Sequence, residues 1–461
     1  MPPKSITARS VRQHWTNHQE IALLDVREEG PYAACHPLFA INVPVSEIET
    51  KVPGLVPRLS APIVVYDNGE GYAARAAIRI TALGYQDVSI LADGLAGYAR
   101  VGEVYRDVNT PSKAFGELVE SIAHTPSLSA REVKDLIDGS GEQEVVVLDA
   151  RRFEEYHTMG IPRGRSCPGG ELLYRVFEAA RDPETLVVVN CAGRTRSIIG
   201  TQTLVNAGIP NPIRALRNGT IGWMLDGFEV DMQKTEKVPQ PSVTAVQRVR
   251  QHADSWAKYQ LLAESADRTL YLLDVRDPEE YARGHPAGFA TDEWMGVRGA
   301  RIVLYDTDGV RAPMTASWLL QLGWEAYVAS AAENLSIPQG PSCTVSPSGA
   351  ITVEGLQALT GATVVDLARS PAYRRGHIPG AWFASGPDLA RDLNQVNGDG
   401  PFVLTSPDGA VAAMNVADAR QSVTRPVFYL AGGTTAWVTA RNPLETEARW
   451  LSEPIDVYQQ T

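Results

Sequence analysis

Short runs of apolar residues alternate along this chain with longer segments in which apolar residues recur at helical spacing. One run, Leu186–Val189, contains three β-branched residues and predicts a buried strand. The segment that follows, from Ile198 to Val205, has a helical pattern that ends at Gly208. Because buried strands that alternate with helices form parallel sheets covered on both faces, the pattern predicts an α/β fold.

This strand–helix unit occurs four times. Its first strand ends in an acidic residue followed by an arginine: Asp25 and Arg27, Asp149 and Arg151, Asp274 and Arg276, and, with the arginine displaced by one position, Asp366 and Arg369. A second strand ends 42 residues later in two copies, at Asp67 and Cys191, but only 32 residues later in the third, at Asp306. From that position to a helix-ending glycine there are 17 residues in all three copies. Such equal spacings predict tandem repeats, of which the third is compressed.

Turn-rich linkers rich in Pro, Ser and Gln separate the copies and place the domain boundaries. We expect the first repeat at 1–108, a linker or helix at 109–126, the second repeat at 127–238, the third at 243–335 and the fourth at 345–450. Each would be a small parallel sheet flanked by helices. A length of 461 residues is consistent with about three or four domains.

Composition excludes several classes of function. A net charge of −12 argues against non-specific binding to nucleic acid or to an anionic membrane surface. Four scattered cysteines without a Cys-x-x-Cys pair argue against a disulfide framework or a zinc site, so no metal is expected. No window approaches 18 apolar residues and no apolar signal-peptide core is found, which predicts a cytoplasmic protein.

The candidate reaction centre is Cys191, between the end of a strand and the start of a helix. Backbone N–H groups are unpaired there and the helix dipole is positive, an environment that favours a nucleophilic thiolate. Arg194 and Arg196 add positive charge and are expected to bind an anionic substrate together with the other loop residues, Ala192, Gly193, Thr195 and Ser197.

Five further residues are candidates for supporting roles. Asp149, Arg151 and the aromatic Trp223 recur in copies without a cysteine, which favours structural roles for them. Cys167 is interpreted as a small core residue, with a resolving thiol as the alternative. Glu171 follows two glycines, and we expect it to approach the loop.

These motifs together resemble the rhodanese (sulfurtransferase) family. The resemblance rests on the strand with Asp149 and Arg151, the turn Gly-His-Ile-Pro-Gly-Ala at 376–381, the loop at Cys191 and the closing turn at 219–223. It implies four tandem rhodanese-like domains, of which one is active. The positions that match Cys191 are Asp67, Asp306 and Ser406, so the resemblance implies that the first, third and fourth repeats are silent. The loop Cys-Ala-Gly-Arg-Thr-Arg departs from the family's usual thiosulfate and mercaptopyruvate loops and leaves the donor open.

The resemblance implies that Cys191 accepts sulfane sulfur from a small anionic donor, thiosulfate-like or a thiol persulfide, and passes it to cyanide or a thiol without metal or organic cofactor. A homo-oligomer or a sulfur-relay protein is a possible partner. Two alternatives stay open. A phosphatase or arsenate reductase of related fold would use a Cys-x5-Arg loop, whereas Cys191 and Arg196 enclose four residues. A non-catalytic scaffold of such domains is the other.

Overall fold

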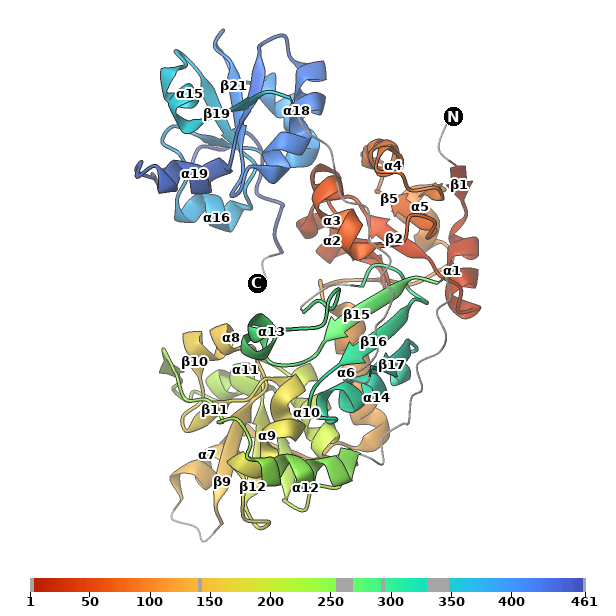
Figure 1. Cartoon of the computed structure of the whole chain (residues 1–461), viewed down its shortest axis with the longest axis vertical. Coiled ribbons are helices and arrows are strands. Elements are labelled where there is room, and N and C mark those ends of the chain that lie inside the picture. The colour runs from red at the N-terminus through yellow and green to blue at the C-terminus, as the bar shows by residue number, and fades with distance from the viewer. Residues whose placement is uncertain (1–3, 140–142, 254–267, 292–294, 330–347, 459–461) are drawn as a thin grey trace. The chain divides into compact units, whose positions relative to one another are not determined.

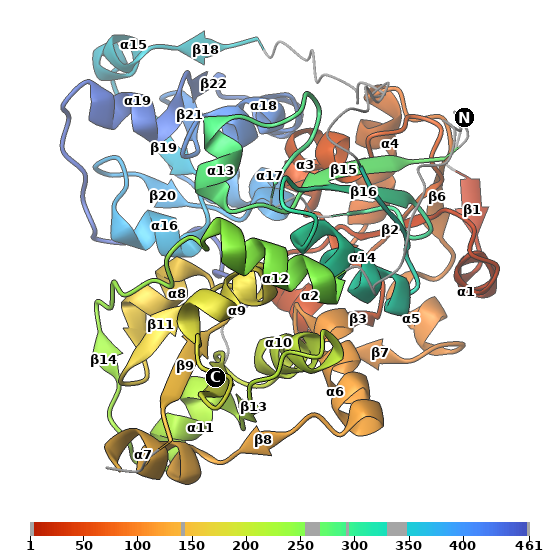
Figure 2. The ribbon, with the colours of Figure 1, turned by 60° about the horizontal axis from the view of Figure 1, so that its bottom comes forward.

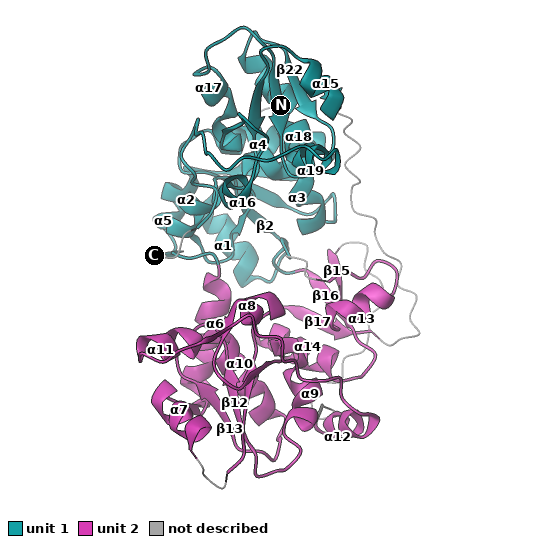
Figure 3. Cartoon of the chain, turned by 90° about the vertical axis from the view of Figure 1, so that its left-hand side faces the viewer, with its two compact units in different colours: residues 1–108, 294–299, 338–461 teal, residues 109–293, 300–337 magenta. Residues whose placement is uncertain are grey.

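The computed structural model describes residues 4–139, 143–253, 268–291, 295–329 and 348–458 (Figures 1 and 2). The chain divides into two compact units, coloured separately in Figure 3. Unit 1 comprises residues 1–108, 294–299 and 338–461, and unit 2 comprises residues 109–293 and 300–337. The first repeat therefore shares a unit with the fourth, and the second with the third.

The second repeat is a five-stranded parallel sheet in the order β11-β9-β12-β13-β8, with a separate antiparallel pair β10-β14. Its elements are β8 (Ser127–Leu128), α7 (Ala130–Asp138), β9 (Val145–Asp149), α8 (Phe153–Thr158), β10 (Met159–Gly160), β11 (Gly164–Ser166), the 3₁₀ turn η2 (Gly169–Glu171), α9 (Leu172–Ala179), β12 (Leu186–Asn190), α10 (Thr195–Asn206), β13 (Ile213–Leu216), α11 (Gly219–Leu225) and β14 (Asp231–Met232). The predicted strand at 186–189 is thus the central strand, β12.

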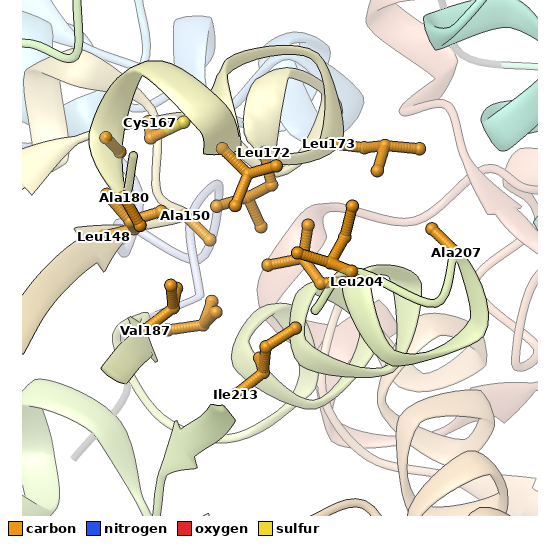
Figure 4. Close-up of a cluster of buried hydrophobic side chains, with 14 of the residues drawn as sticks. Leu148, Ala150, Cys167, Leu172, Leu173, Ala180, Val187, Leu204, Ala207 and Ile213 are labelled. Atoms are coloured by element: carbon orange, nitrogen blue, oxygen red, sulfur yellow. The ribbon is translucent and has the colours of Figure 1, made fainter. Parts of the chain in front are cut away.

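Alternation along β12 explains why both faces of this sheet are covered. Val187 and Val189 point to one face and join a core formed with α9 and α10, including Leu172 and Leu204 (Figure 4). Val188 points to the other face, to the core formed with α7 and α11. A strand buried on both sides reads as a continuous apolar run, which is why the sequence signal was so clear.

The third repeat is reduced, as its short spacing predicted. In its described residues the sheet has three parallel strands, in the order β15-β16-β17. Its elements are α12 (Val243–Ala253), β15 (Leu270–Asp274), α13 (Pro278–Arg283), β16 (Arg301–Tyr305), α14 (Arg311–Gln321) and β17 (Glu325–Val328). Residues 294–299, expected in this repeat, belong to unit 1, where the Gly296 N–H donates to the Leu55 carbonyl at 3.0 Å.

In unit 1 the first repeat has a five-stranded parallel sheet in the order β1-β6-β5-β2-β4 and an antiparallel pair β3-β7. Its elements are β1 (Lys4–Ile6), α1 (Ala8–Thr16), β2 (Ala22–Asp25), α2 (Glu29–Ala34), β3 (His36–Pro37), β4 (Ile41–Asn42), η1 (Val45–Glu47), α3 (Ile48–Leu55), β5 (Ile63–Tyr66), α4 (Tyr72–Ala82), β6 (Val88–Leu91), α5 (Gly94–Ala99) and β7 (Val104–Tyr105).

The fourth repeat has the matching order β18-β22-β21-β19-β20, also parallel. Its elements are β18 (Ala350–Ile351), α15 (Val353–Ala358), β19 (Thr363–Asp366), α16 (Ser370–Arg375), β20 (Trp382–Phe383), η3 (Gly386–Asp388), α17 (Leu389–Leu393), β21 (Phe402–Thr405), α18 (Ala410–Ser422), β22 (Val427–Leu430) and α19 (Gly433–Thr439). The predicted α/β fold of repeated parallel sheets is confirmed. Among the described residues, no helix has the length and apolar character needed to cross a membrane.

Candidate active site

Cys191 follows the last residue of β12 and lies four residues before the start of α10. Its side chain is 2% exposed. The Sγ atom lies 3.4 Å from the Ser197 hydroxyl, which itself donates to the Arg194 carbonyl at 2.8 Å. The thiol is therefore held against the first turn of α10, where helical N–H groups lack intrahelical acceptors.

The start of α11 fixes the backbone of the cysteine loop. The Cys191 carbonyl accepts a hydrogen bond from the Thr220 N–H at 2.8 Å, and the Ala192 carbonyl accepts one from the Ile221 N–H at 2.9 Å. Gly219 has a φ of 54°, and a Cβ at this position would lie 2.3 Å from the Cys191 carbonyl oxygen. Only glycine permits this approach, so the loop requires glycine at the start of α11.

Beneath the loop lies a buried polar network centred on Asp149. Its carboxylate accepts two hydrogen bonds from the Arg151 guanidinium, at 2.8 and 2.7 Å, and one from the Asn190 side-chain amide at 2.8 Å. Arg151 also donates to the Met159 carbonyl at 2.7 Å, and Asn190 to the Thr220 hydroxyl at 3.1 Å. These bonds tie the ends of two neighbouring strands to the start of α11, the arrangement expected of structural residues.

The three repeats without a cysteine at this position reveal where the loop directs its backbone N–H groups. In each, the side chain at the cysteine position accepts a hydrogen bond from the backbone N–H six residues later. These bonds are Ala73 to Asp67 at 2.9 Å, Ala312 to Asp306 at 2.8 Å and Ala412 to Ser406 at 3.3 Å. The residue six positions after Cys191 is Ser197, so the common geometry assigns its N–H to the space around the Cys191 side chain.

In two of these repeats a carboxyl group occupies this space. Asp67 also accepts the Gly69 N–H at 3.0 Å, and Asp306 also accepts the Gly309 and Val310 N–H groups at 2.9 and 3.1 Å. A carboxylate that gathers two or three N–H groups marks the loop as an anion-binding turn. In the second repeat a sulfur atom stands at the same place.

Both arginines predicted to bind substrate are paired with carboxylates of the chain. Arg196 donates to both oxygens of Glu155, at 2.6 and 2.8 Å. These bonds lower the pKa of Glu155, and the pKa of Arg196 is raised, first by Glu155 and more weakly by the Cys191 thiolate. Arg194 is bound to Glu120 and lies 3.2 Å from Glu117.

The segment at 109–126, predicted as a linker or helix, contains a helix of unit 2 that packs on the start of α10. This helix, α6 (Thr110–Ala123), lies beside α10 in Figures 1 and 2. At its Gly116 an added Cβ would lie 2.9 Å from the Thr195 side chain, so the two helices are in close contact. The helix also supplies Glu117 and Glu120, the partners of Arg194.

The remaining predicted candidates are Cys167, Glu171 and Trp223. Cys167 is fully buried among aliphatic side chains (Figure 4), and burial raises the pKa of its thiol. Glu171 was expected to approach the loop, and its carboxylate accepts hydrogen bonds from Arg175 at 2.6 Å and from Arg311 at 2.7 Å. Trp223 is fully buried and donates from Nε1 to the Glu229 carbonyl at 2.7 Å.

Sequence reasoning missed Asn190, Thr220, Glu155 and Glu120. Asn190 pairs in register with Asp149, but the other repeats carry Tyr66, Tyr305 and Thr405 at this place, so repetition did not mark it. In the part of the chain that the structure describes, no group of three or more His, Cys, Asp or Glu side chains is arranged to hold a metal ion. Cys343 lies outside the described residues.

Comparison with known families gives the class of the protein. The family model for the rhodanese-like domain matches residues 7–100, 129–226 and 352–440, more than half of the chain. The chain belongs to this family, and the resemblance seen in its motifs is confirmed. The model does not match the third repeat, whose Asp274–Arg276 pair and three strands nevertheless follow the same pattern.

Solved structures give a more particular relative. A thiosulfate sulfurtransferase from Pseudomonas aeruginosa is 44% identical, with a TM-score of 0.92, over 99% of this chain and 93% of that one. This chain is a homologue of that sulfurtransferase along nearly its whole length. The Alr3790 protein from Anabaena sp. is 24% identical over 25% of this chain and 93% of its own, with a TM-score of 0.21. No curated protein matches the chain.

Proposed function

We propose that this chain moves sulfane sulfur from a small anionic donor to a nucleophilic acceptor through a persulfide on Cys191. The observation that carries the proposal is the difference between the repeats in the side chain at the cysteine position. Three repeats hold an oxygen side chain against the loop N–H groups, and the second repeat holds a thiol there. The similarity to a thiosulfate sulfurtransferase supports thiosulfate as the donor.

The reaction has two displacements. The Cys191 thiolate attacks the outer sulfur of thiosulfate, the S–S bond of the donor breaks, and sulfite leaves with the bonding electron pair. Cyanide or a thiolate then attacks the terminal sulfur of the persulfide, which yields thiocyanate or a new persulfide and restores the Cys191 thiolate. Atoms and charge balance without an oxidant or a cofactor.

The loop can stabilise the negative charge at both stages. The Ser197 N–H and the neighbouring first-turn N–H groups of α10 surround the position where Asp67 and Asp306 hold a carboxylate in their own repeats. The Ser197 hydroxyl lies 3.4 Å from Sγ and can turn from the Arg194 carbonyl to donate to a thiolate. Donor capture then falls to Arg194 and Arg196, once they exchange their carboxylate partners for the donor.

The silent third repeat has a structural role in this proposal. Its Arg311 is fully buried and donates to Glu171 at 2.7 Å, Glu280 at 2.6 Å and Asp308 at 2.8 Å. Glu171 opens α9, one of the helices that cover the sheet of the second repeat. A buried charge with three carboxylate partners fixes one arrangement of two packed repeats, since each unpaired partner would be costly. A cytoplasmic location and a sulfur-relay or self-association partner remain predictions.

Intact mass measurement after incubation with thiosulfate, mercaptopyruvate or glutathione persulfide tests the proposal. We expect a gain of one sulfur atom with the right donor, and removal of it by cyanide. Cys191→Ser should abolish both the gain and thiocyanate formation, whereas Cys35→Ser and Cys343→Ser should retain them. Undiminished turnover in Cys191→Ser would show that another group carries the sulfur.

A further inference from the structure

Three repeats fill the end of their first strand with the same ion pair. In each, an aspartate accepts two hydrogen bonds from the guanidinium of the arginine two residues later. The same guanidinium also donates to a backbone carbonyl eight residues further on. The sets are Asp25, Arg27 and the Cys35 carbonyl; Asp149, Arg151 and the Met159 carbonyl; and Asp274, Arg276 and the Gly284 carbonyl.

The fourth repeat keeps the aspartate and lacks the guanidinium. Two residues after Asp366 stands Ala368, and the displaced Arg369 turns away to Glu29 at 2.6 Å and to the Asp456 carbonyl at 3.0 Å. Asp366 is 1% exposed and accepts the Ala368 N–H at 2.8 Å. Within the described residues, no cation and no second donor is bonded to this carboxylate.

A pocket of about 280 Å³ occupies the place of the missing side chain. Asp366, Ala368 and Gly376 line it, and these are the positions of the carboxylate, the arginine and the carbonyl in the other three repeats. Among the described residues no hydrogen bond reaches the Gly376 carbonyl. Thr434 and Val438 line another part of the pocket, which offers a hydroxyl group and an apolar surface.

The geometry points to this pocket as a binding site for an alkylguanidinium cation. The planar fork would donate to the Asp366 carboxylate and to the Gly376 carbonyl, as Arg151 does to Asp149 and Met159 in the second repeat. A volume of about 280 Å³ exceeds what a bare guanidinium fills, which leaves room for a short alkyl chain against Val438. The side chain of free arginine belongs to this chemical class.

The electrostatics of the empty pocket favour a cation. Burial raises the pKa of Asp366 to about 6, while the Ala368 N–H and the nearby His377 lower it less. His377 and Tyr373 are titratable side chains that interact with this carboxylate. His377 donates from Nδ1 to the Tyr373 carbonyl at 2.8 Å, and its Nε2 lies 3.6 Å from the Glu445 carboxylate. A bound guanidinium would replace the missing ion-pair partner of a buried carboxylate, which is otherwise costly to ionise.

Calorimetric titration of the full chain with methylguanidinium chloride at pH 7.5, against matched sodium chloride, tests this site. We expect one site per chain, with methylammonium bound about tenfold more weakly because it lacks the planar fork. Ala368→Arg restores the side chain of the other repeats and should abolish binding, raise the melting temperature and leave sulfur transfer unchanged.

Asp366→Asn keeps an oxygen for the Ala368 N–H but removes the charge, and it should weaken binding by about ten- to a hundredfold. This second variant keeps the test informative if Ala368→Arg folds poorly. Equal binding by the wild-type chain and either variant, or equal affinity for methylammonium, would overturn the assignment. So would the absence of saturable binding to the wild-type chain.

Discussion

The ion pair between Arg196 and Glu155 sets the first prediction, because it competes with the donor for the same guanidinium. The pair is bidentate, at 2.6 and 2.8 Å, but the two side chains are 41% and 39% exposed. Solvent screening at such exposure limits an ion pair to roughly 0.2–1 kcal/mol. A donor dianion beside the same guanidinium in the loop would gain about 1.5–3 kcal/mol. The exchange of Glu155 for the donor is therefore favourable.

Two substitutions should change the rate in opposite directions. Arg196→Ala removes the donor contact and should lower kcat/KM for thiosulfate about ten- to a hundredfold. Glu155→Gln removes the competing charge and keeps the shape of the side chain. Because the competition costs at most about 1 kcal/mol, this variant should raise kcat/KM by up to about fivefold. A purely structural pair would lose activity in both variants.

The assay is initial-rate thiocyanate formation at several pH values with thiosulfate, and sulfur loading from a neutral persulfide donor. Loss of thiolate character at Cys191 would be recovered at higher pH, whereas loss of donor binding would persist at every pH. Arg194→Ala is tested in parallel, since Arg194 is similarly exposed and is paired with Glu120. We expect the neutral donor to be less affected by either arginine substitution. Equal rates with thiosulfate and the neutral donor in both variants would refute a role in donor capture.

Three further predictions concern the loops without a cysteine, a buried carboxyl group and the alternative phosphatase chemistry. Asp67→Cys in a Cys191→Ser background should form no thiocyanate and should lower the melting temperature, because two backbone N–H groups lose their carboxylate acceptor; transfer by this variant would contradict the structural role of the first repeat. Burial raises the pKa of Glu28 from 4.5 to about 8, so the folded chain holds this proton and loses stability as pH rises between those values, by up to about 1.4 kcal/mol per pH unit. Glu28→Gln removes that dependence, so its free energy of unfolding in urea should increase relative to that of the wild type between pH 5.5 and 7.5. If the unfolding free energies of the two proteins changed in parallel with pH, the assignment would be disproved. Aryl phosphate hydrolysis should be negligible, because Cys191 and Arg196 enclose one residue fewer than the phosphatase loop; hydrolysis at rates near those of sulfur transfer would overturn this.

The repeats were predictable because each one encodes its own fold locally. The apolar run before Cys191 is buried on both faces of its sheet, and this leaves a signal that no amphipathic strand would give. The Asp-x-Arg motif was equally legible, since residues two apart at the end of a strand form the pair by themselves. Its structural role followed from its recurrence in the repeats that carry Asp67 and Asp306 in place of the cysteine.

The arrangement of repeats in units was not predictable from the same signals. Contacts between the first and fourth repeats depend on residues more than 300 positions apart, such as Arg369 with Glu29 and Tyr72 with Asp388. No periodicity along the chain marks such pairs. A helix was among the predictions for the segment at 109–126, but its contact with Thr195 was not predictable, because that contact lies outside its own pattern.

The partners of the loop arginines show where local reasoning stops. A positive charge beside a cysteine indicates an anion, but the sequence does not distinguish a substrate from a carboxylate of the chain. Glu155 lies 41 positions before Arg196, and it reaches the loop because β9 and β12 are neighbours and α8 follows β9. In the fourth repeat a charge lacks its partner instead. Because the arginine is displaced by one residue, Asp366 is buried beside a pocket. The aspartate–arginine pair thus fills the end of the first strand in the second repeat, whereas the separation of Asp366 from Arg369 in the fourth repeat leaves a pocket there.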